Sequence, residues 1–89
     1  MIEEIIVIIN KLGLHARAAA KLVNTAASFA SSVSINFADQ QADAKSIMSV
    51  MMLAASQGSM INITCDGNDE VAALEAITHL INDYFGEEE

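Results

Sequence analysis

A histidine and the basic residues around it are the side chains of this sequence best suited to do chemistry. His15 lies in the segment LGLHARAAAKL, residues 12–22, two positions before Arg17. The chain has twelve acidic and four basic residues and a formal net charge of -8, yet no acidic residue occurs between Glu4 and Asp39. Three of the four basic residues lie in that interval. The positive charge of an acidic protein is therefore concentrated around one imidazole.

An imidazole at the start of a helix has the means to accept a phosphoryl group. A helix that begins at Ala16 leaves the backbone N–H groups of Ala16 and Arg17 without partners inside the helix. Such groups bind phosphate-like anions, and their positive potential favours a neutral ring with a free lone pair. We therefore predict that His15 is a nucleophile towards phosphorus, and that the two N–H groups and the Arg17 guanidinium stabilise the resulting dianion. Gly13 is expected to let the chain turn sharply into the helix and present His15 outwards.

Other interpretations of the histidines compete with this one. His15 by itself could be a surface or capping residue, but the adjoining glycine, arginine and basic interval favour a chemical role. A small hydrolase built on His15 and a serine is disfavoured, because no carboxylate lies near His15 in the sequence to orient the ring. His79 is flanked at helical spacing by acidic residues and is interpreted as a surface residue. Because Cys65 is the single cysteine and there is no Cys/His cluster, we predict neither a metal site nor a cofactor.

Length and composition restrict the class of protein. Eighty-nine residues predict a single domain, residues 1–89, with Cys65 as a core residue. The acidic start of the chain is unlike a signal peptide, and the apolar run at residues 5–9 is far too short to cross a membrane, so we expect a cytoplasmic protein. The net negative charge argues against a nucleic-acid partner.

Hydrophobic periodicity predicts alternating strands and helices. Apolar alternation covers one face of the later strands, so we expect helices on one side of a sheet. Phe85 completes the inward stripe of the last helix, which begins with Val71, and the acidic tail, residues 87–89, is expected to be frayed and without a role. The predicted elements are a strand at 5–9, a helix from 16, a strand at 33–37, a brief return strand after a turn at 39–41, a short helix at 47–55, a strand at 61–65 and a helix from about 69.

Two blocks of the sequence resemble a known family. The segment NKLGLHARAAAKLV, residues 10–23, closely resembles the active-site motif of HPr, the histidine-containing phosphocarrier of the bacterial phosphotransferase system. The segment KSIMSVMMLAA, residues 45–55, resembles the regulatory-serine segment of the same family. Their separation and the chain length also agree, so the resemblance covers essentially the whole chain. One difference is Ala18, which lies where the family often has proline.

The resemblance implies a fold and a reaction. The fold is α+β, an open-faced β-sandwich in which three helices pack on one face of a four-stranded antiparallel sheet. His15 would take a phosphoryl group from enzyme I, carry it on Nδ1 and pass it to an acceptor of the IIA type, with assistance from Arg17. Such a monomer is a carrier of phosphoryl groups, and it does not turn over a small-molecule substrate. The alternative is a regulatory, nitrogen-related module of the same fold that acts by phosphorylation-dependent binding to proteins.

The second block carries two further hypotheses. Ser46 can cap the short helix, and the resemblance adds that it is phosphorylated where the host has an HPr kinase/phosphorylase. Methionines suit a surface that must fit several partners. We therefore predict that Ile47, Met48 and Met51 are exposed and dock partner proteins, and that Met52 or Val50 is buried.

Overall fold

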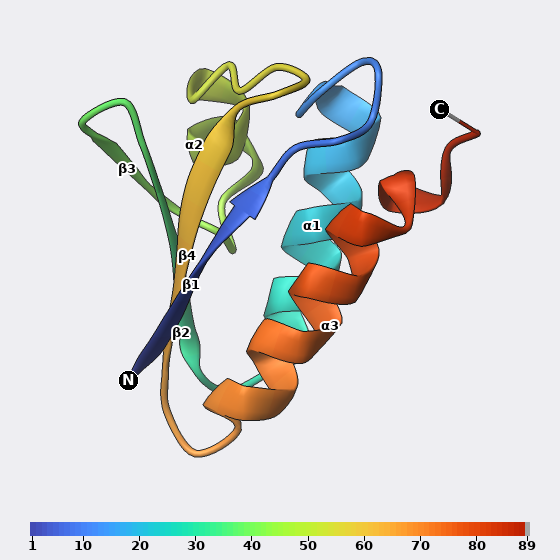
Figure 1. Ribbon diagram of the computed structural model, residues 1–89. Coiled ribbons are helices and arrows are strands. Elements are labelled where there is room, and N and C mark those ends of the chain that lie inside the picture. The colour runs from blue at the N-terminus through green and yellow to red at the C-terminus, as the bar shows by residue number, and fades with distance from the viewer. Residues whose placement is uncertain (89) are drawn as a thin grey trace.

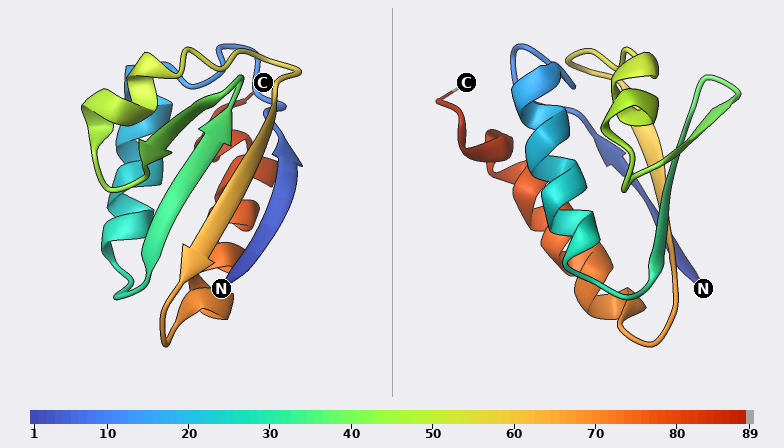
Figure 2. Two further views of the ribbon diagram at one scale, coloured as in Figure 1. Left: turned by 90° about the vertical axis from the view of Figure 1, so that its left-hand side faces the viewer. Right: turned by 180° about the vertical axis from the view of Figure 1, so that it is seen from behind.

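The protein is an open-faced α+β sandwich. The structure, a computed structural model, describes residues 1–88 (Figure 1). Within them, one four-stranded antiparallel sheet with strand order β1-β4-β2-β3 is covered on one face by three helices (Figure 2). The predicted fold class is confirmed. The elements are β1 (Ile2–Val7), α1 (Ala16–Ala27), β2 (Ser32–Phe37), β3 (Gln40–Asp43), α2 (Ile47–Met52), β4 (Met60–Asp66), α3 (Glu70–Asn82) and the short 3-10 helix η1 (Tyr84–Gly86).

The core lies between the sheet and the helices. Every second side chain of the central strands points under the helices, because side chains alternate between the faces of a strand. Burial of one isoleucine side chain contributes about 1.5–3 kcal/mol to the stability of the fold. The buried side chains of β2 and β4 are Val33, Ile35, Ile61, Ile63 and Cys65. The other face of the sheet stays open, and the apolar side chains of Ile5, Val7 and Met60 are exposed.

The first strand differs from the expected one. A strand at residues 5–9 was predicted from its apolar run, whereas β1 spans Ile2–Val7. Pairing with β4 begins at Ile2 opposite Cys65. Glu3 also fits in β1, because its carboxylate accepts a hydrogen bond from the amide of Asn62 on the neighbouring strand, at 3.3 Å. An acidic side chain that is satisfied across the ladder does not interrupt a strand.

The inward stripe of the last helix was predicted only in part. α1 begins at Ala16 as expected, and its buried residues are Ala18, Ala19, Leu22 and Ala26. In α3 the buried positions are Ala73, Ile77 and Ile81, which recur every fourth residue. Val71 is two positions out of this register and is exposed, so its assignment to the inward stripe was wrong.

The chain makes a tight turn after α3. Phe85 is fully buried as predicted, but it lies in η1 and not on the stripe of α3. Tyr84, Phe85 and Gly86 have φ values of 58°, 54° and 76°, three left-handed residues in succession. After this turn the last described residues reach the level of the first turn of α1 (Figure 1).

Candidate functional site

His15 is the residue that caps α1. Its backbone is extended, with φ -76° and ψ 178°, and its ring nitrogen Nδ1 accepts a hydrogen bond from the backbone N–H of Arg17 at 3.3 Å. The first turn of α1 contains no acidic residue. The ring is a quarter exposed and the Arg17 side chain two-thirds exposed. The predicted imidazole and guanidinium therefore lie together at one helix start, where the backbone N–H of Arg17 donates to the ring.

A glycine sets the path of the chain into this helix. Gly13 has a φ of +66°, and a Cβ atom at this position would lie 2.7 Å from the backbone oxygen of Ala55. That same oxygen accepts a hydrogen bond from the N–H of Leu14 at 2.9 Å. The segment that follows α2 thus packs directly against the loop that carries His15. The predicted role of Gly13 in the turn is confirmed, and the close approach adds a second reason why no side chain fits there.

A carboxylate from the far end of the chain contacts the histidine. One oxygen of Glu87, Oε2, lies 2.5 Å from Nε2 of His15 and 3.7 Å from Nε of Arg17. The other oxygen, Oε1, accepts a hydrogen bond at 3.0 Å from the side-chain amide of Asn10, which is fully buried. The Glu87 side chain is only a tenth exposed. The expectation that this tail is frayed was wrong for Glu87.

The remaining tail residues differ from Glu87. Glu88 is exposed and lines a small hollow beside Arg17, together with Lys11 and Leu12. Glu89 lies outside the described residues, so the expectation for it is not tested. No pattern in the sequence pointed to Glu87, because 72 positions separate it from His15 and the two residues that follow it are also glutamates.

The hydrogen bonds and nearby charges around Glu87 affect its pKa more strongly than its burial does. Burial by itself raises the pKa of this carboxyl, but the hydrogen bonds from Asn10 and His15, with the nearby charges of His15 and Arg17, lower the pKa below its ordinary value. The carboxylate is therefore ionised in the neutral pH range. The sequence argument against a hydrolase was that no carboxylate lies near His15 in the sequence, whereas the fold brings the carboxylate of Glu87 to the ring.

The short helix α2 presents its apolar side chains to solvent. Ile47, Met48 and Met51 are exposed as predicted, and Val50 is the buried member of the segment. Met52 is exposed as well. In Figures 1 and 2, α2 lies at the same end of the molecule as the first turn of α1. The sequence analysis missed Leu12, an exposed apolar side chain in the loop before His15, which its place in a motif could have indicated.

Ser46 acts as the cap of α2. Its hydroxyl accepts a hydrogen bond from the N–H of Ser49 at 3.4 Å, as the sequence predicted. The neighbouring Lys45 is engaged elsewhere, since its ammonium group donates to the backbone oxygen of Phe29 at 2.9 Å. Lys45 is thus not directed towards Ser46.

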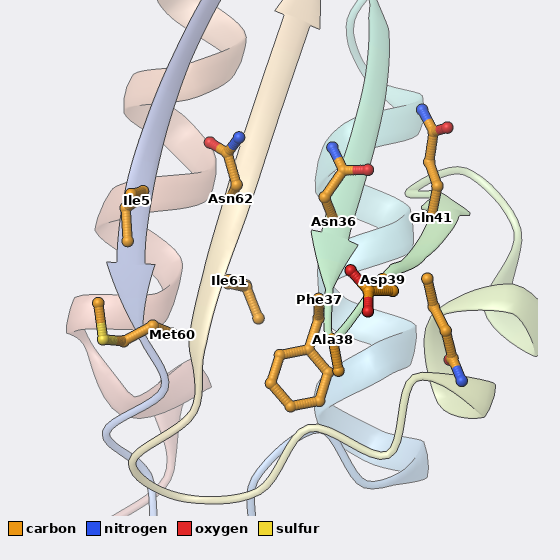
Figure 3. A pocket seen from close by; sticks show the side chains of 10 residues that line it. Ile5, Asn36, Phe37, Ala38, Asp39, Gln41, Met60, Ile61 and Asn62 are labelled. Atoms are coloured by element: carbon orange, nitrogen blue, oxygen red, sulfur yellow. The ribbon is translucent and has the colours of Figure 1, made fainter.

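Other regions of the molecule have fewer side chains that could take part in a reaction. The hollow on the open face of the sheet is lined by side chains such as Asn36, Phe37 and Met60, and Asp39 is the one titratable residue among its lining residues (Figure 3). Cys65 is buried as predicted, and burial raises the pKa of its thiol.

Among residues 1–88 no group of three or more His, Cys, Asp or Glu side chains could hold a metal ion. In the same described part, every helix is too short or too polar to cross a membrane.

Comparison with known proteins identifies the family. The family model described as "PTS HPr component phosphorylation site" matches residues 2–83. The chain belongs to the HPr family. Curated HPr relatives include the "Phosphocarrier protein HPr" of Neisseria meningitidis serogroup A and that of Cupriavidus necator. Each is 52% identical over 89 residues, with both chains covered completely.

Solved HPr structures agree with the fold. The crystal structure of HPr-C-His from Thermoanaerobacter tengcongensis is 44% identical, covers both chains completely and superposes with a TM-score of 0.96. The phosphocarrier protein HPr of Bacillus anthracis is 39% identical and has a TM-score of 0.87 over 90% of this chain and 95% of its own. The chain is accordingly a phosphocarrier of the phosphotransferase system, and neither its fold nor its relatives favour the regulatory alternative or a hydrolase.

Proposed function

We propose that His15 is the residue that carries the phosphoryl group, on its nitrogen Nδ1. The observation that carries this proposal is the position of the ring at the start of α1. There Nδ1 faces the backbone N–H of Arg17 at 3.3 Å, and the ring edge is partly open to solvent. A nucleophile must reach its electrophile on a partner protein, and a capping histidine on a surface helix can do so.

The surroundings of His15 suit a bound phosphoryl dianion. After Nδ1 bonds to phosphorus, the N–H groups of Ala16 and Arg17 can donate to phosphoryl oxygens instead of to the ring. The Arg17 guanidinium is mostly exposed and can turn towards the same oxygens. Ala18 adds a backbone N–H that proline would lack. We assign the phosphate-binding role to these backbone groups and the assisting role to the Arg17 side chain.

The partners follow from the family. We propose that enzyme I is the donor and a protein of the IIA type is the acceptor, with sugar transport and nitrogen regulation both open as pathways. The chain is a stoichiometric carrier, and each phosphoryl group that it accepts leaves to another protein. The cytoplasmic location and the monomeric state remain predictions.

Incubation with enzyme I and phosphoenolpyruvate tests the proposal. We expect the intact protein to gain one phosphoryl group that is stable in base and labile in acid, since a phosphorus–nitrogen bond breaks when the ring is protonated. Peptide mapping should place it on His15. A label that survives acid, as a serine ester would, contradicts the proposal, and so does a label on His79.

The exposed side chains of α2 form a proposed docking surface, consisting of Ile47, Met48 and Met51. We expect Met48→Glu to slow transfer from enzyme I by about tenfold or more, because interface hot spots contribute above about 1 kcal/mol and a buried charge is unfavourable. Steady-state transfer at several concentrations of the variant measures the effect.

A second methionine supplies the control for this substitution. Met60 is as exposed as Met48 but lies on the open face of the sheet. Met60→Glu should leave transfer unchanged, and both variants should keep the melting temperature within a few degrees. Equal transfer by the two variants would place the docking surface elsewhere.

We also propose that Ser46 is a site of phosphorylation where the host has a serine kinase. Support comes from its half-buried hydroxyl at the edge of the docking surface and from the family motif. A phosphate there adds negative charge beside the exposed side chains of α2, which would weaken docking of a partner that fits the uncharged surface.

A further inference from the structure

The tail of the chain contributes a second functional group to the histidine site. The carboxylate of Glu87 lies 2.5 Å from Nε2 of His15, on the opposite side of the ring from Nδ1. An ionised carboxylate can only accept a hydrogen bond, so Nε2 must carry the hydrogen. Nδ1 independently accepts from the N–H of Arg17. Two contacts from different parts of the chain thus specify the same neutral tautomer, with its lone pair on Nδ1.

Glu87 is held in place by a built set of contacts. Asn10 is fully buried and donates both to Oε1 of Glu87 at 3.0 Å and to the backbone oxygen of Gly13 at 2.9 Å. If the Asn10 amide were flipped, its oxygen would face the backbone oxygen of Gly13 and the carboxylate of Glu87, both of which are acceptors. The Asn10 NH2 group must therefore be the donor to Glu87. Asn10 therefore links the turn before His15 to the end of the chain.

The backbone before Glu87 is strained in order to reach this position. Left-handed conformations are unfavourable for Tyr84 and Phe85, and such conformations persist where the surrounding structure enforces them. Two contacts do so, because the Phe85 ring is fully buried and its backbone oxygen accepts a hydrogen bond from the Lys21 ammonium group at 2.6 Å. As a result, Glu87 lies against His15 at the start of α1.

We infer that Glu87 is a positioning residue for phosphoryl transfer, because it orients the His15 ring and balances the charge that the ring acquires. This inference rests on the proposed role of His15. The lone pair of Nδ1 forms the new bond to phosphorus, and the broken bond leaves its electron pair on the donor nitrogen. Nε2 keeps its hydrogen, so the phosphorylated ring carries one positive charge beside the doubly negative phosphoryl group. The Glu87 carboxylate is already placed to stabilise that ring.

The charge of Glu87 also has an unfavourable effect, which Arg17 reduces. A carboxylate near the site repels an incoming dianion. Glu87 is on the Nε2 side of the ring, however, and the Arg17 guanidinium lies 3.7 Å from its Oε2 and is largely exposed. Arg17 can move to the phosphoryl group while Glu87 keeps its bonds to Asn10 and His15. The charged groups around the ring are Arg17 from α1 and Glu87 from the tail, with Lys11 and Glu88 along the adjoining hollow.

The test compares Glu87→Gln with Glu88→Gln in the full chain. Both variants lose one negative charge from the same tail, but only Glu87 contacts His15 in the structure. We expect transfer from enzyme I to Glu87→Gln to be about tenfold slower, and transfer to Glu88→Gln to be unchanged. Glu87→Ala should behave like Glu87→Gln, and the melting temperatures show that the variants are folded.

Two readouts separate this role from a merely structural one. In nitrogen-15 NMR spectra, the Nε2–H signal of His15 should be protected from exchange with water in the parent protein and lose that protection in Glu87→Ala. In the phosphorylated protein, the carboxylate stabilises the positively charged ring. Hydrolysis of the phosphoryl group at one fixed, mildly acidic pH should therefore be up to about tenfold slower in Glu87→Gln than in the parent protein.

The outcomes distinguish this inference from the proposed function. If both Gln variants accept and lose the phosphoryl group on His15 at the rates of the parent protein, the inference for Glu87 is overturned and the carrier role of His15 stands. If the parent protein gains no phosphoryl group on His15, the proposed function itself fails. A loss of rate shared equally by the two variants also overturns the inference, because it reflects the charge of the tail and not the contact with the ring.

Discussion

Replacing His15 with alanine is expected to abolish phosphorylation by enzyme I. The variant lacks the lone pair that forms the phosphorus–nitrogen bond, and loss of a nucleophile lowers rates by at least about a thousandfold. The fold should survive, because the change removes one helix cap, which contributes about 1 kcal/mol, while the buried side chains of α1 remain. Labelling from phosphoenolpyruvate measures the first effect, and thermal unfolding measures the second.

The second histidine gives the matched control. His79 lies exposed near the end of α3. His79→Ala should be labelled within about twofold of the parent protein. If His15→Ala is labelled as well as His79→Ala, the phosphoryl group is carried elsewhere and the assignment of His15 is wrong.

Replacing Gly13 with alanine is expected to have the largest effect on stability among single-methyl changes near the site. The new Cβ would lie 2.7 Å from the backbone oxygen of Ala55 and 2.8 Å from the Cα of Ser56. Neither atom can rotate away. Backbone displacement costs about 1–3 kcal/mol and the left-handed φ about 1–2 kcal/mol, so the free energy of unfolding should fall by about 2–5 kcal/mol. Chemical denaturation measures it.

Another glycine separates crowding from backbone conformation. Gly58 also has a positive φ, of +91°, but a Cβ there would meet no atom within 4 Å. Gly58→Ala should therefore lose only the conformational part, about 1–2 kcal/mol. Because Gly13 precedes His15 by two residues, Gly13→Ala should also slow phosphorylation, and Gly58→Ala should not. Equal losses of stability in the two variants would contradict the role of the close contact with Ala55.

The local sequence was sufficient to predict the helix start and its histidine. A capping residue, a glycine before it and a run of helix-forming residues after it act over a few positions, so they can be recognised without the fold. For the same reason the hydrophobic alternation of β2 and β4 gave the covered face of the sheet correctly. Errors arose where neighbours in space decide the outcome. Glu3 belongs to β1 because an asparagine on β4 satisfies it, and Val71 is exposed because the register of α3 is set by its contacts with the sheet.

The sequence by itself determined which imidazole lies at a helix start beside backbone N–H groups and an arginine, since that environment is built from consecutive residues. Only the tertiary structure decided what faces the other side of that ring. Glu87 reaches His15 because Phe85 is buried, Lys21 holds its backbone oxygen and Asn10 binds the carboxylate. Each of those contacts joins segments that are distant in the chain. Nothing in the composition of a glutamate-rich tail distinguishes the one carboxylate that the fold places against the histidine.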